Sequence, residues 1–94
     1  MSAKPIEVLP TPSADELAAI KSSWGTWSCG VKFFPWSYSE DETAYLLEGE
    51  VIVTPDDKSL PAVTCKAGDF VKFPSGMSCT WDVKAPINKH YKFG

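Results

Sequence analysis

The chain has 94 residues and a formal net charge of −3, which fits one small domain spanning residues 1–94. The mild negative charge and the lack of a basic cluster argue against a nucleic-acid partner. No apolar run is long enough to suggest a membrane span. Cys29, Cys65 and Cys79 form no CxxC pair, so neither a disulfide framework nor a structural zinc site is predicted.

Free thiols without a secretory signal are typical of a reducing compartment. We therefore predict an intracellular protein, either cytoplasmic or organellar. A removed transit peptide would leave no trace in this chain, so the sequence does not separate the two locations.

The first part of the chain, residues 1–23, is expected to hold a short strand and the single helix. Ile6–Leu9 is apolar, and two prolines follow it. Ser13 and Glu16 then have the S-x-x-E spacing of a capping box, in which each side chain accepts from the other's backbone amide. This pattern predicts a helix over Ala14–Lys21.

From residue 24 to residue 94 the pattern changes to short apolar segments separated by turn residues, which is typical of an antiparallel barrel. We predict that Gly49, Gly68 and the Pro74-Ser75-Gly76 segment form tight turns between strands. The expected strands are 31–33, 44–47, 51–53, 62–65, 70–73, 78–83 and 89–93.

Two spaced motifs run through this region. They are Gly30-x5-Trp36-x-Tyr38-x3-Glu42-x6-Gly49 and Gly68-x5-Pro74-x-Gly76-x2-Cys79. Their spacing resembles the two motifs of the cupin superfamily, in which two histidines, a glutamate and a later histidine bind a metal. The resemblance implies an all-β, cupin-type antiparallel jelly-roll barrel with a ligand pocket inside.

Further residues resemble small single-domain cupins of the ureidoglycine aminohydrolase-like and ethanolamine-utilisation-like kind. They are Trp27, Glu42-x-x-Tyr45-x-Leu47-Glu48-Gly49, Ala67-Gly68-Asp69, Trp81 and Lys89-His90-Tyr91. The wider superfamily includes metal-dependent enzymes and non-enzymatic binders, so the resemblance implies a fold and leaves the reaction open.

The metal positions of the motifs are changed in this chain, where only Glu42 keeps its usual residue type. The indole nitrogen of Trp36 has no lone pair to offer, and Tyr38 is a poor ligand while its phenol is protonated. A hard carboxylate from Glu42 and a soft thiolate from Cys79 suit different metals. We therefore predict no metal site and no cofactor.

Strand alternation predicts an aromatic pocket around Glu42. Alternating residues on two strands would line this pocket, and Met77 would lie near its rim. The full predicted ligand-binding set is Trp36, Tyr38, Glu42, Met77, Cys79 and Trp81. The alternative is that these side chains fill the barrel as ordinary core. Lys32 shares the parity of Trp36 but is expected at the surface. His90, the single histidine, is expected either at the surface or packed within a strand.

Three functions stay open from the sequence. The first is a metal-free module that binds a small organic molecule. The second is a hydrolase or isomerase that uses Glu42 with Tyr38 or Cys79, with or without a metal, although no nearby cation would activate the thiol. The third is a structural domain with an unused pocket. Pairing into a homodimer, through sheet edges or Ile6–Leu9, would cover exposed edges and apolar surface.

Overall fold

The computed structural model describes residues 4–94, and within them it has seven strands and one helix. In chain order these are β1 (Glu7–Leu9), α1 (Ala14–Ser23), β2 (Gly25–Cys29), β3 (Lys32–Ser37), β4 (Glu42–Pro55), β5 (Val63–Lys66), β6 (Phe70–Phe73) and β7 (Ser78–Phe93). No helix of this described part is long and apolar enough to cross a membrane.

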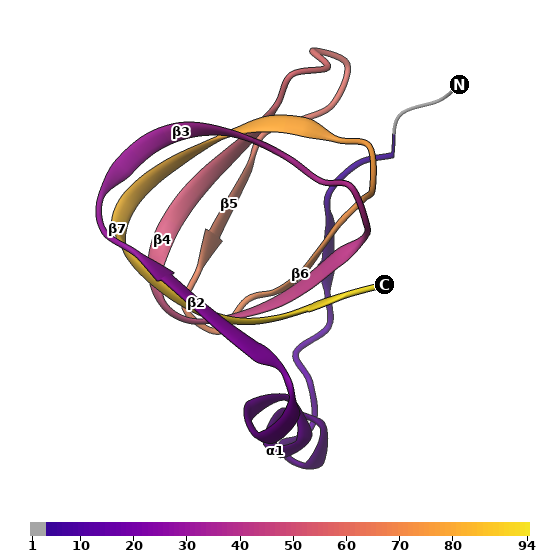
Figure 1. Ribbon diagram of the computed structural model, residues 1–94, viewed down its shortest axis with the longest axis vertical. Coiled ribbons are helices and arrows are strands. Elements are labelled where there is room, and N and C mark those ends of the chain that lie inside the picture. The colour runs from indigo at the N-terminus through magenta and orange to yellow at the C-terminus, as the bar shows by residue number, and fades with distance from the viewer. Residues whose placement is uncertain (1–3) are drawn as a thin grey trace.

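All strand pairs are antiparallel and belong to one strongly curved sheet. The order is β1-β6-β4-β7-β2, with β3 added beside β7 and β5 beside β4. The strands wrap around a central space, and α1 lies outside it at one end (Figure 1). This arrangement confirms the predicted jelly-roll fold with one short helix. Among residues 4–94 the hydrogen-bonded path has two ends, so the sheet does not close into a full barrel.

The helix forms where the capping box predicts it. The Glu16 amide donates to Ser13 Oγ, and the Ser13 amide donates to Glu16 Oε1, both at 3.2 Å. Ile20 on its inner side is buried. Helix α1 extends two residues beyond the predicted Lys21, to Ser23.

The turn predicted at Gly49 is absent, because β4 runs unbroken through this position. Gly49 has a φ of +97°, and the pairing of β4 with β7 shifts register around it. A Cβ atom here would lie 2.2 Å from the carbonyl oxygen of Pro86 on β7. Gly49 is therefore a β-bulge glycine that bends two paired strands together. The predicted strands 78–83 and 89–93 are likewise parts of one continuous strand, β7.

The other two predicted turns are confirmed. Gly68, with a φ of +91°, lies between β5 and β6, where the Lys66 amide donates to Asp69 Oδ2 at 2.9 Å. Gly76, with a φ of +82°, lies between β6 and β7, and its amide donates to the Tyr38 carbonyl at 2.7 Å. The Gly68 turn does not reverse the chain, because β5 and β6 both pair antiparallel with β4.

The inward faces of the strands form one apolar core. Val51, Val53, Val71 and Phe73 are fully buried there. They alternate with more exposed neighbours along β4 and β6, as expected for strands with one covered face. The core fills one part of the enclosed space, and the rest forms a cavity.

Candidate functional site

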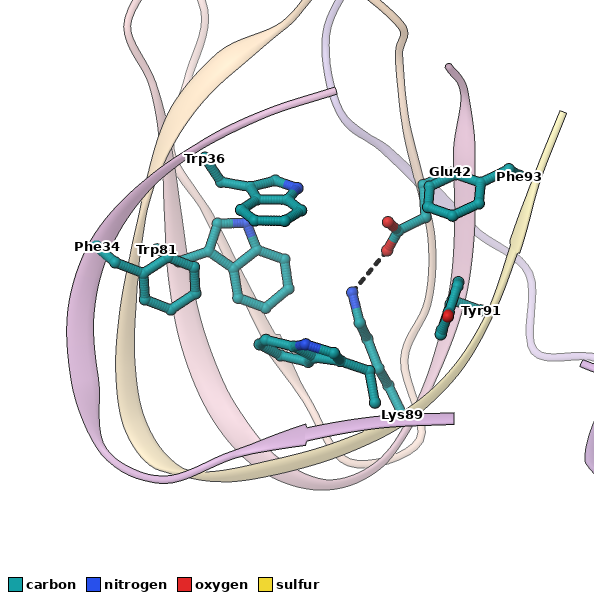
Figure 2. Close-up of a pocket in the computed structure, with 8 residues that line it drawn as sticks. Phe34, Trp36, Glu42, Trp81, Lys89, Tyr91 and Phe93 are labelled. Carbon is teal, nitrogen blue, oxygen red and sulfur yellow. Dashed lines mark hydrogen bonds and ion pairs between the residues drawn. The ribbon is translucent and has the colours of Figure 1, made fainter. Parts of the chain in front are cut away.

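A cavity of about 190 Å³ opens inside the curved sheet. Strands β2, β3, β4 and β7 line it with six aromatic residues and one pair of opposite charges (Figure 2). The lining residues are Trp27, Phe34, Trp36, Glu42, Trp81, Lys89, Tyr91 and Phe93.

Strand β7 supplies half of this lining because its odd-numbered residues share the inner face. Antiparallel pairing then places Phe34 on β3 opposite Trp81, and Trp27 on β2 opposite Lys89. Phe34 stacks on Trp81 with ring centroids 6.1 Å apart. Trp27 meets Trp81 edge to face at 5.9 Å. The cavity wall is therefore a packed cluster of rings whose positions support one another.

The polar part of the cavity is an ion pair between Lys89 and Glu42. Lys89 Nζ donates to Glu42 Oε2 at 2.6 Å, and the two side chains are only 7% and 5% exposed. The ammonium also lies 4.7 Å from the ring centroid of Trp81, 5.0 Å from that of Trp27 and 6.0 Å from that of Tyr91. A carboxylate and three ring faces thus stabilise one buried positive charge.

Two aromatic residues mark the open side of the cavity. Trp36 on β3 and Phe93 at the end of β7 are each 48% exposed, although both contribute to the lining. Trp36 packs edge to face on Phe34 at 6.4 Å. The rings in the wall are covered by other rings, whereas these two leave apolar surface toward solvent at the entrance.

Of the six residues predicted for the pocket, the structure brings Trp36, Glu42 and Trp81 together in the cavity. Tyr38 lies in the core instead. Its ring stacks on Phe73 at 5.0 Å, and its hydroxyl accepts from Trp81 Nε1 at 3.1 Å. Tyr38 therefore supports the cavity wall from behind.

Cys79 and Met77 also lie outside the cavity lining, which corrects their predicted place. Cys79 is 1% exposed within the core. Met77 borders a separate hollow of about 530 Å³, together with Asp56 and Leu60. The physical reason is that strand parity does not separate core from cavity: Val83 and Ile87 share the inner face of β7 with Trp81 and Lys89, yet they lie in the core and outside the cavity lining.

The chemistry of Tyr38 and Cys79 follows from their burial. Burial raises the pKa of the Cys79 thiol to about 11, and the negative charge of Asp56 adds to this shift. Burial also raises the pKa of Tyr38, and the nearby charge of Glu42 raises it further. Both groups are protonated at neutral pH, so neither supplies a nucleophile or base to the cavity.

Four lining residues were not predicted as site residues from the sequence: Phe34, Lys89, Tyr91 and Phe93. Trp27 was predicted only as part of a motif. Strand alternation could have predicted Lys89 and Tyr91 as lining residues, because both are odd-numbered residues of β7, like Trp81. The signal for pairing Lys89 with Glu42 is absent from the sequence, because 47 positions separate them.

Lys32 and His90 also have definite positions. Lys32 is exposed, with Nζ 5.2 Å from the centroid of Phe34, outside the cavity lining. His90 is 8% exposed within β7, where it pairs with Tyr45 of β4. Lys32 was expected at the surface, and of the two positions expected for His90 the structure has the one packed within a strand.

The residues at the metal positions of the cupin motifs do not fit a transition metal. Glu42 already accepts from the Lys89 ammonium, which would repel a second cation beside it. Tyr38 and Cys79 hold their protons, and the Trp36 indole can only donate. In the described part of the chain, no three His, Cys, Asp or Glu side chains lie close enough together to hold a metal ion.

Comparison with known proteins identifies the family. The family model for the EutQ-like cupin domain matches residues 17–91. This chain therefore belongs to the EutQ-like cupin family. A search of curated proteins found no significant match.

Solved structures agree with this assignment. A DUF861 family protein from Thermotoga maritima is 37% identical with a TM-score of 0.83, over 94% of this chain and 100% of that one. A putative ethanolamine utilization protein Q from Salmonella typhimurium LT2 is 25% identical with a TM-score of 0.64, over 94% and 66% of the two chains. The Clostridium difficile EutQ protein, at 16% identity and a TM-score of 0.65 over 94% and 66%, shares the fold.

Proposed function

We propose that this protein is a binding module that holds a small, flat organic molecule in its aromatic cavity without a metal. The observation that carries the proposal is the cavity itself, in which six aromatic residues surround a single buried ion pair. Binding pockets typically combine apolar walls with a few placed polar groups.

The size of the cavity limits the ligand. An apolar protein cavity of about 150 Å³ holds one benzene molecule. At about 190 Å³ this cavity accommodates one six-membered ring with a small substituent.

The exposed rings at the entrance support a bound ligand over a filled core. Trp36 and Phe93 leave about half of their surface in solvent beside the opening. A ligand that covers this surface gains roughly 25 cal/mol per Å² of apolar area, before ordering costs. The aromatic walls would supply most of the affinity, and the ion pair would orient the polar end.

The enzymatic alternative has less support. It assigned Tyr38 or Cys79 as the partner of Glu42, but both are buried and protonated behind the cavity wall. Glu42 is the one predicted catalytic candidate that faces the cavity, and its carboxylate is held by Lys89.

Isothermal titration with toluene tests the proposal. We expect saturable binding to the wild-type protein, weakened about two- to twelvefold in Trp36→Ala, because one aromatic contact contributes about 0.5–1.5 kcal/mol. Trp36 is half-exposed, so this variant should keep its fold.

Phe33→Ala is the matched control. Phe33 lies on the same strand, is 71% exposed and does not line the cavity. Its removal should leave toluene affinity unchanged. Absence of saturable binding to the wild type, or an equal loss in both variants, would contradict the proposed function.

A further inference from the structure

The ion pair in the cavity keeps unused hydrogen-bonding capacity. A lysine ammonium has three protons and a carboxylate has two acceptor oxygens. The interaction at 2.6 Å uses one proton of Lys89 and one oxygen, Oε2, of Glu42. Within residues 4–94, no other hydrogen bond involves either group. Both side chains line the cavity, where they lie next to each other between the aromatic walls (Figure 2).

These groups offer a ligand one donor and one acceptor side by side. The remaining N–H groups of Lys89 can donate to a carbonyl oxygen. Glu42 Oε1 can accept from an N–H. A planar molecule with adjacent N–H and C=O groups would bind both at once. It would give each of these two buried charged groups a further hydrogen bond.

The charge of the pair selects the ligand as well. Lys89 and Glu42 together carry no net charge, and only apolar rings surround them. A charged ligand would be attracted by one member of the pair and repelled by the other, so it would gain little net Coulomb energy. Either charged ligand would also lose its hydration shell on entering the apolar cavity.

We propose that the ligand is a neutral aromatic or heteroaromatic carboxamide or lactam, whose carbonyl accepts from Lys89 and whose N–H donates to Glu42. This inference rests on the proposed function and adds the chemical class of the ligand. The ring would lie between Trp27 and Trp81 on one side and the entrance residue Trp36 on the other.

A series of nearly isosteric probes tests the inference by isothermal titration. Benzamide has the donor and the acceptor, acetophenone has only the acceptor, benzoate is anionic and benzamidinium is cationic. We expect benzamide to bind at least about tenfold more tightly than either charged probe, because each charged probe loses its hydration shell in the apolar cavity and meets one like charge. Acetophenone should bind a few-fold less tightly than benzamide.

A variant provides a second readout. Glu42→Gln removes the negative charge that opposes benzoate, so the ratio of benzoate to benzamide affinity should rise several-fold relative to the wild type. The wild-type ranking is decisive even where this variant folds poorly.

The outcomes separate this inference from the proposed function. If benzoate or benzamidinium binds as tightly as benzamide, the inference is wrong. If toluene binds while benzamide gains nothing over it, the inference is wrong and the proposed function stands. If no probe binds, the proposed function fails together with the inference.

Discussion

At the scale of single residues, Glu42 has a different partner from the one that the cupin motifs imply. It is the one metal-binding position that this chain retains, and its carboxylate contacts the ammonium of Lys89 at 2.6 Å. The ammonium of Lys89 thus balances the charge of the buried Glu42 carboxylate, at a position where the cupin motifs imply a metal ion. Three aromatic rings lie within 6.0 Å of the Lys89 ammonium, and both side chains of the pair are buried. The pair is stable only as a unit, because either charge alone would be buried without compensation.

Removing one member of the pair should therefore cost much stability. We expect Lys89→Met and Glu42→Leu each to lower the free energy of unfolding by about 3–5 kcal/mol. The double variant replaces the pair with apolar side chains and should be more stable than either single variant. Urea denaturation of the three proteins measures this. Single variants within about 1 kcal/mol of wild type, as at a surface pair, would contradict the description of a buried pair.

The buried thiols predict how stability changes at alkaline pH. Burial raises the pKa of Cys79 to about 11 and that of Cys65 to about 12, from an ordinary 9.0. Because these folded-state pKa values are raised, the thiols stabilise the fold fully below pH 9.0, and this contribution is lost as the pH rises toward 11.

Urea denaturation at a series of pH values on either side of 9.0 checks this expectation. The free energy of unfolding should fall as the pH rises, and Cys79→Ala should flatten the fall. Cys29→Ala, which removes a half-buried thiol, should flatten it less. An equal slope in wild type and Cys79→Ala would show that this thiol ionises freely in the folded protein.

The sequence predicts part of the cavity lining and misses the rest for an identifiable reason. Trp36, Glu42 and Trp81 follow from motif spacing and strand parity. Tyr38 shares the parity of Trp36, but it lies just past the end of β3, where its ring turns onto Phe73. Lys89 was missed because its pairing with Glu42 depends on how β7 crosses the sheet.

At the scale of elements, the two long strands β4 and β7 shape the molecule. They run 14 and 16 residues and pair with each other along most of their length. The helix and the turns at Gly68 and Gly76 were predictable, because caps and turn residues act locally. The continuity of β4 was not, because whether Gly49 forms a turn or a bulge depends on its distant partner Pro86.

Two glycines make a matched test of this bulge. Gly49 and Gly68 have similar φ angles, +97° and +91°, but only Gly49 has backbone atoms of another strand against it. Gly68→Ala should cost about 1–2 kcal/mol for the left-handed backbone conformation alone. Gly49→Ala adds a clash with Pro86 and should cost clearly more. Equal losses in thermal unfolding would mean that the bulge tolerates a side chain.

At the scale of the whole molecule, apolar residues remain on the outer surface. Three of them are Val8 on β1, Val31 just before β3 and Phe33 on β3, which are 61%, 66% and 71% exposed. Within the described residues, β1 pairs only with β6, and β3 only with β7, so both strands present a free edge. Homodimer formation therefore stays a prediction with a physical motive.

Light scattering at micromolar concentration tests this prediction. We expect a dimeric mass for the wild type and a shift toward monomer in Val8→Lys, which places a charge on the free edge of β1. Ile6 is buried and so should serve the core and not the interface. A monomeric wild type would contradict the prediction, and a dimer unaffected by Val8→Lys would place the interface elsewhere.

The measurement that tests the central claim most directly is the metal dependence of binding. Protein purified without a histidine tag is analysed for bound metals and then titrated with benzamide before and after dialysis against a chelator. Metal-free binding predicts substoichiometric metal and the same affinity in both titrations. A stoichiometric transition metal, or binding that is lost with the chelator and restored by a metal, would contradict the claim that Lys89 and the aromatic walls form the site without one.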